Sequence, residues 1–79
     1  MSIEDAFGQV LRECRRDRGL SQDELAFRTG YSRNYIGLLE AGKKSPTLAT
    51  IARLAEVLDV VPSDLFVRVE ERMRVVDGG

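Results

Sequence analysis

The sequence predicts an all-α protein that folds as a compact bundle of five helices. Apolar residues recur every three or four positions along most of the chain, which is the spacing of one face of a helix. Ser or Thr precedes several of these segments and Gly follows several of them, as expected of helix caps. A chain of 79 residues is enough for one domain, so residues 1–79 are predicted to form a single unit.

The first, fourth and fifth helices are the longer ones. We expect the first over residues 3–18, and the fourth after the cap residue Thr47. Pro62 suits the first turn of a fifth helix over residues 62–75. From Phe66 onward apolar and charged residues also alternate, so a strand remains an alternative there. The predicted core is Phe7, Leu11, Leu25, Ile36, Leu39, Ile51, Leu54, Leu58 and Leu65.

Two shorter helices in the middle of the chain are joined by a tight turn. Ser21 and Glu24 form a capping box that starts the second helix, and Gly30 ends it. Ser32 then caps the third helix. Glycine tolerates the positive φ of such a turn, so residues 21–41 are predicted to form a helix-turn-helix.

Composition excludes several functional classes. The chain has no His and a single Cys, which removes the usual zinc sites and an internal disulfide and favours a reducing cytoplasm. No apolar run approaches the roughly 20 residues of a membrane span. There is no glycine-rich phosphate loop and no paired-carboxylate motif, so we do not expect an enzyme.

The charge is unevenly distributed. The net charge of −1 is unfavourable for binding phosphates. However, most of the basic residues precede Thr47, whereas acids outnumber bases after it, so a local basic surface remains available. The early basic residues are Arg12, Arg15, Arg16, Arg18, Arg28, Arg33, Lys43 and Lys44.

Three segments around the helix-turn-helix carry a specific pattern. They are Leu20-Ser21-Gln22-x-x-Leu25-Ala26, Gly30-x-Ser32-Arg33-x-Tyr35-Ile36, and Leu39-Glu40-x-Gly42-x-x-x-Pro46-Thr47-Leu48. This pattern resembles the XRE/Cro family, which includes the lambdoid phage repressors, and the match extends over residues 10–66. The stretch 32–37 is similar in particular to restriction–modification controller proteins. The resemblance implies a lambda-repressor-like fold that binds a double-stranded DNA operator as a homodimer without a cofactor.

Arg33 and Asn34 are the expected base-reading residues, because they open the third helix, which enters the major groove in this motif. Arginine can pair with guanine O6 and N7, and asparagine with adenine N6 and N7. Tyr35 has three alternatives: a phosphate, a thymine methyl group, or packing between the helices. The resemblance implies that Gln22 bonds a phosphate and braces the third helix. The remaining expected DNA contacts are Ser32, Gly37, Leu38, Lys43, Lys44, Ser45 and Thr47.

Two further side chains are given structural roles. By the same resemblance, Arg15 of the first helix pairs with Glu40 at the end of the third, which fixes the angle between these helices. Cys14 falls on the apolar stripe of the first helix and is expected to be a buried thiol rather than a redox sensor.

Apolar residues after Pro62 exceed what one small core can use, which indicates a homodimer held by segment 62–76. We predict a helix–helix contact at Leu65, Phe66, Val69, Met73 and Val76, with paired strands as the alternative. In the lambda repressor an acidic patch at the start of the second helix contacts the sigma factor of RNA polymerase, and Asp23 stands at the matching place, so the sigma factor is a further expected partner. The leading function is a controller or phage-type repressor; an antitoxin-type autoregulator and an interaction module that has lost DNA binding are the alternatives.

Overall fold

A computed structural model of the chain describes the backbone of residues 1–78 and the side chains of residues 1–74. The predicted five-helix, all-α fold is confirmed, and the described residues contain no strand, so the strand considered from Phe66 onward is wrong. The helices are α1 (Ile3–Asp17), α2 (Gln22–Thr29), α3 (Arg33–Glu40), α4 (Leu48–Leu58) and α5 (Pro62–Gly78).

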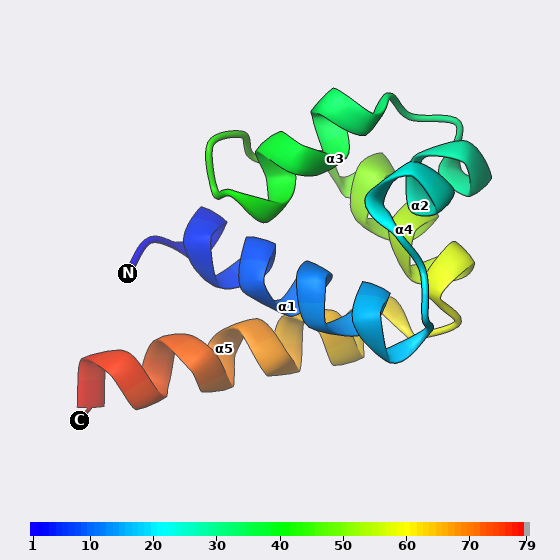
Figure 1. Cartoon of the computed structure of the whole chain (residues 1–79). Helices are drawn as coiled ribbons and strands as arrows, with labels where there is room; N and C mark the ends of the chain where they lie inside the picture. The colour runs from blue at the N-terminus through cyan, green and yellow to red at the C-terminus, as the bar shows by residue number, and fades with distance from the viewer. Residues whose placement is uncertain (79) are drawn as a thin grey trace.

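The longest two helices, α1 and α5, lie side by side and run in opposite directions (Figure 1). On its other side α1 packs against α3, while α2 packs against α3 and α4. The two helices of the helix-turn-helix therefore rest on a platform formed by α1 and α4. No helix in the described part of the chain is long and apolar enough to cross a membrane.

Local capping explains where α2 and α3 begin and end. The backbone N–H of Glu24 donates to Ser21 Oγ at 3.0 Å, and the Glu24 carboxylate accepts from the Ser21 N–H at 3.1 Å. Gly30 ends α2 with a φ of 83°, in the left-handed region that glycine favours. Ser32 Oγ caps α3 by accepting from the N–H of Tyr35. The turn between the helices is thus fixed by short-range contacts.

All nine predicted core residues are buried, and the close approach of α1 to α3 depends on Gly8. A Cβ atom at Gly8 would lie 2.5 Å from the carbonyl oxygens of both Leu39 and Glu40. The backbone of α1 therefore touches the end of α3 directly, which sets how far α3 projects from the rest of the molecule.

Helix α5 presents a different face from the one predicted for the dimer contact. Leu65 and Val69 are each 1% exposed and belong to the core of a single chain, and Met73 is half-buried against that core. An interface centred on Leu65 and Val69 is therefore wrong, because α1 and α4 already cover them. The apolar side chains that α5 leaves exposed are Phe66 and Val67, while the side chain of Val76 lies outside the described residues.

Candidate nucleic-acid interface

Helix α3 exposes its first turn and buries its opposite face. Ile36 and Leu39 are completely buried and anchor the helix. Arg33 and Asn34 are exposed at its N-terminal end, with 65% of the Arg33 side chain accessible. Polar side chains of the types that read base edges thus stand on a firmly held helix.

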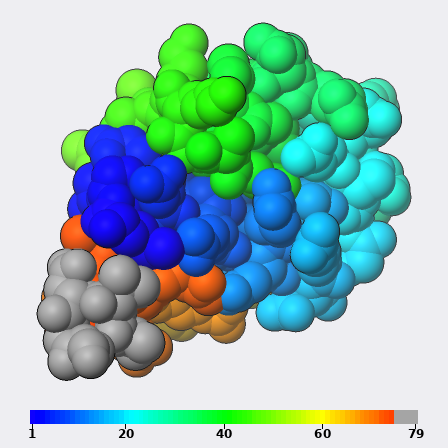
Figure 2. All heavy atoms as spheres, turned by 60° about the vertical axis from the view of Figure 1, so that its left-hand side comes forward, coloured from blue at the N-terminus to red at the C-terminus, as the bar shows by residue number. Residues whose placement is uncertain are grey.

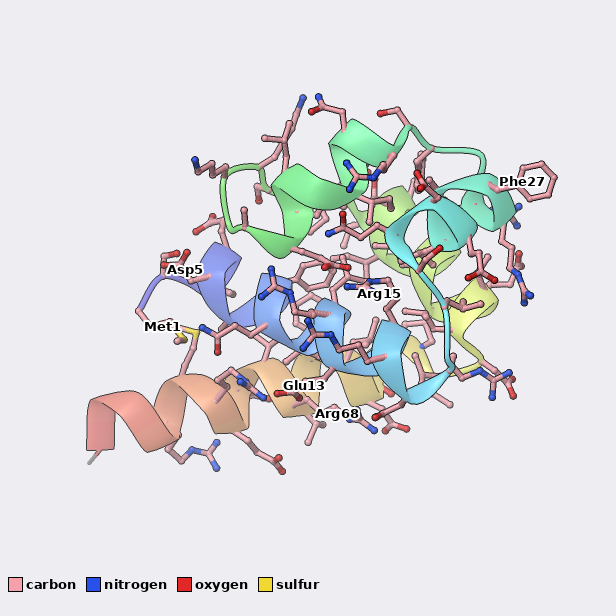
Figure 3. The ribbon with its side chains drawn as sticks, in the orientation of Figure 1. Met1, Asp5, Glu13, Arg15, Phe27 and Arg68 are labelled. Carbon is pink, nitrogen blue, oxygen red and sulfur yellow. The ribbon has the colours of Figure 1, made fainter. Side chains whose placement is uncertain are left out.

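A buried carboxylate holds the other end of α3. The Glu40 side chain has no exposed area, and it accepts from Arg15 Nε at 2.6 Å and Nη2 at 3.0 Å. Arg12 Nε lies 3.4 Å away and Gln22 Nε2 donates at 3.1 Å. Arg15 also donates to the carbonyl oxygen of Leu20. The ion pair implied by the sequence resemblance is therefore present, and together with Gln22 it joins α1, α2 and α3 at one point. Figure 3 labels Arg15 of this cluster.

The pKa values of this cluster follow from the same contacts. Burial by itself would raise the pKa of Glu40, but the hydrogen bonds from Arg15, Gln22 and Arg12 outweigh it and hold the pKa below its ordinary value. The hydrogen bond to Glu40 raises the pKa of Arg15 further. Both groups are therefore charged at neutral pH, and each depends on the other.

Gln22 lies where the prediction requires, at the start of α2 and bonded to the end of α3 through Glu40. The side-chain NH2 group has two N–H donors and uses one for Glu40, so the second N–H can still donate to a phosphate. The structure thus shows the bracing contact and leaves the phosphate contact as a prediction.

Tyr35 packs between helices, the third of its predicted alternatives. Its hydroxyl lies 3.1 Å from Thr50 Oγ1, which lies 2.9 Å from Thr47 Oγ1. Its ring meets Tyr31 edge-on with centroids 5.3 Å apart, and Lys44 Nζ lies 5.6 Å above the ring. This chain of contacts ties α3 to the capped start of α4.

The rest of the predicted DNA surface continues from α3 into the loop that follows it. A Cβ atom at Gly37 would meet nothing within 4 Å, so this position leaves open space for a close approach. Leu38 is partly exposed, whereas Lys43, Lys44 and Ser45 are exposed. Between residues 25 and 47 the only acid is Glu40, which is buried, so the exposed charges of this stretch are all positive.

Two polar contacts of the helix-turn-helix were not predicted from the sequence. Arg53 of α4 donates from Nε to the carbonyl oxygen of Thr29 and from Nη2 to that of Arg28, which caps the end of α2 with a positive charge. Asp23 Oδ1 of α2 lies 3.3 Å from Arg33 Nε. The Arg53 contact spans 24 residues and has no local signal, whereas the spacing of Asp23 and Arg33 across the turn could have suggested their pairing.

Cys14 is buried, as expected, beneath α5. Arg68 Nη1 donates to its sulfur at 3.3 Å, and this arginine lies with Glu13 along the contact between α1 and α5 (Figure 3). Burial raises the pKa of the Cys14 thiol, against the opposing effect of the Arg68 charge. A buried thiol with a raised pKa is a poor nucleophile, which supports the structural role.

An apolar groove of about 250 Å³ lies next to the loop after α3. Figure 2 shows this end of the molecule, where the start of α1, the loop after α3 and helix α5 come together. The groove is lined chiefly by Ile3, Phe7, Pro46, Leu48, Ile51 and Phe66, and Leu48 is 82% exposed.

The comparisons with known proteins agree on one family. The family model described as Helix-turn-helix matches residues 11–66. An uncharacterized HTH-type transcriptional regulator of Sinorhizobium fredii, y4dJ, is 34% identical over 71 residues, which cover 90% of this chain and 92% of that protein.

Solved structures show the same fold. The clp gene regulator ClgR from Corynebacterium glutamicum superposes with a TM-score of 0.94 at 26% identity, covering 99% of this chain and 83% of that one. The restriction-modification controller protein C.AhdI from Aeromonas hydrophila gives a TM-score of 0.76 at 45% identity, covering 78% and 94%.

Proposed function

This chain belongs to the helix-turn-helix family of transcriptional regulators, and we propose that it binds an operator in double-stranded DNA as a homodimer in the cytoplasm, without catalytic activity. The observation that carries the proposal is the presentation of α3. Its buried face and the Glu40 cluster hold it firmly, and Arg33 and Asn34 project from its first turn. A helix held in this way can enter a major groove without reorganising the domain.

Base reading and phosphate binding fall to different residues in this proposal. Arg33 and Asn34 read base edges, whereas Gln22, Ser32, Lys43, Lys44, Ser45 and Thr47 position the domain on the phosphates. Gly37 and Leu38 form the surface between the base-reading and the phosphate-binding residues, where the helix approaches the DNA closely. The buried Glu40 does not oppose the DNA, because its charge is neutralised by Arg15. A chain of net charge −1 can therefore present a basic surface at this one place.

The experiment is selection of bound duplexes from a random library, followed by affinity measurements on the selected operator. Replacing Arg33 by Ala should cost about 1–3 kcal/mol and relax the preference at one base pair. Arg18→Ala is the matched control, since Arg18 is an exposed arginine at the far end of α1. Full retention of sequence preference in Arg33→Ala would show that another residue reads the base.

The dimer contact must use surface that the single chain leaves uncovered. The groove bordered by Leu48 and Phe66 is apolar, and it lies beside the loop that follows α3. A two-fold axis there would place two recognition helices on one face of a duplex, roughly 34 Å apart. It would also double the phosphate contacts, which a chain of low positive charge requires.

Sedimentation tests this contact with two matched variants. Leu48→Asp should give folded monomers, because the side chain projects into solvent and its replacement disturbs no core. Phe27 is 89% exposed and projects outward from α2, at the opposite end of the molecule from Met1 (Figure 3), so Phe27→Asp should remain dimeric. A wild-type protein that stays monomeric at micromolar concentration would exclude the homodimer.

The biological role is most simply that of a restriction–modification controller, given the 45% identity to C.AhdI, with a phage-type repressor and an antitoxin-type autoregulator as neighbouring roles. Adjacent endonuclease and methyltransferase genes would favour the first. The alternative to a DNA-binding regulator is an interaction module that has lost DNA binding. A mobility-shift assay distinguishes the two, because true DNA binding releases counterions and its affinity therefore falls steeply as the salt concentration rises.

A contact between Asp23 and the sigma factor of RNA polymerase would add activation to this function. An Asp23→Asn variant that occupies the operator but fails to activate transcription would support it. Because Asp23 also lies beside Arg33, occupancy of the operator has to be measured in the same experiment.

A further inference from the structure

One ion pair links the two helices of the helix-turn-helix across their exposed surface. Asp23 Oδ1, in the first turn of α2, lies 3.3 Å from Nε of Arg33, in the first turn of α3. Both side chains are largely exposed, so the pair contributes little to stability. It involves, however, the residue with the greatest capacity to read a guanine.

The atoms that form this ion pair determine which donors of Arg33 remain available for DNA. The Asp23 carboxylate occupies the Nε side of the guanidinium. The contact that the structure gives for Arg33 uses Nε, and neither of its Nη groups donates to another described residue. Guanine presents O6 and N7 as neighbouring acceptors, which two Nη donors can reach together. The carboxylate therefore holds the guanidinium and leaves its bidentate end free.

We propose that Asp23 is a specificity-determining residue that orients Arg33 toward a guanine edge and opposes its use as a phosphate contact. This inference rests on the proposed function. An unrestrained arginine can turn to any phosphate it meets, which adds affinity for every sequence alike. The negative charge of Asp23 makes that alternative less favourable, since it is repelled by the phosphates. Asp23 thus lowers affinity for all DNA and widens the gap between operator and other sequences.

The size of the effect follows from the exposure of the pair. Exposed ion pairs change equilibria by about 1.5- to 5-fold, so loss of Asp23 should reduce discrimination by about that factor. Asn keeps the size and the hydrogen-bonding oxygen of Asp without its charge. Asp23→Asn should therefore bind random-sequence DNA more tightly than the wild type while it discriminates less.

The test measures dissociation constants for two duplexes, the selected operator and the same operator changed at the base pair that Arg33→Ala relaxes. The proteins are the wild type, Asp23→Asn, Arg33→Ala and the double variant. Asp17→Asn serves as the charge-matched control, because Asp17 is exposed at the end of α1. We expect Asp23→Asn to bring the ratio of the two dissociation constants closer to one, and Asp17→Asn to leave this ratio unchanged. The ratio for the double variant should equal the ratio for Arg33→Ala.

Two results would overturn the inference while leaving the proposed function intact. One is an unchanged ratio in Asp23→Asn. The other is an equal narrowing of the ratio whether residue 33 is Arg or Ala, because Asp23 would then act without Arg33. A wild-type protein that binds both duplexes and random DNA equally would instead refute the proposed function and the inference with it.

Discussion

Replacement of Glu40 by Met removes the carboxylate that joins α1, α2 and α3. The side chain of Glu40 is fully buried, and Arg15 beside it is nearly so. After the replacement Arg15 keeps only its bond to the carbonyl oxygen of Leu20 and carries an uncompensated charge. Arg12, whose side chain is 46% exposed, can turn to water instead, so most of the cost falls on Arg15.

The expected cost is large for a protein of this size. Removing one member of a buried ion pair typically costs about 3–5 kcal/mol. At about 0.05–0.15 kcal/mol per residue, a chain of 79 residues has a free energy of unfolding of about 4–12 kcal/mol. A loss of about 3 kcal/mol would lower the Tm by about 12–24 °C in a domain of this length.

Urea denaturation measures the coupling free energy between Arg15 and Glu40 when it is applied to four proteins. These are the wild type, Arg15→Met, Glu40→Met and the double variant. We expect each single variant to be strongly destabilised and the double variant to recover much of the loss, because it leaves no unpaired buried charge. Additive losses, with the double variant as unstable as the sum of the two, would refute the interpretation of Glu40 and Arg15 as a coupled buried pair.

The helix-turn-helix could be predicted closely because its determinants are local. Ser21 and Ser32 cap helices within three residues of themselves, and Gly30 adopts its positive φ within a single turn. The apolar spacing of Ile36 and Leu39 sets which face of α3 is exposed, and hence that Arg33 points outward. Such signals extend over a few residues and do not depend on the rest of the fold.

The surface of α5 could not be predicted in the same way. An excess of apolar residues after Pro62 is visible in the sequence, but which of them the core uses depends on where α1 and α4 contact that helix. Leu65 and Val69 face inward, while Phe66 and Val67 remain outside. The partners of Arg53 on α2 are likewise set by tertiary packing.

Four further outcomes follow from the same contacts. The pKa of Glu40 lies below its ordinary value of 4.5, so the charged carboxylate stabilises the fold above pH 4.5. This stabilisation is lost as the pH falls through the lower pKa of the folded state, and an acid titration followed by circular dichroism measures the loss. Lys44→Ala should weaken binding to all sequences alike and reduce the salt slope by about 1. Gly8→Ala should cost about 1–3 kcal/mol, since the new Cβ atom meets two carbonyl oxygens at 2.5 Å. Gly37→Ala is its matched counterpart on an open helix surface, where alanine gains about 1 kcal/mol of helix propensity. Gly37→Ala should therefore raise the Tm and lower operator affinity together, because the added methyl group occupies space that the DNA needs. Unchanged affinity with a raised Tm would show that α3 does not approach DNA at this position.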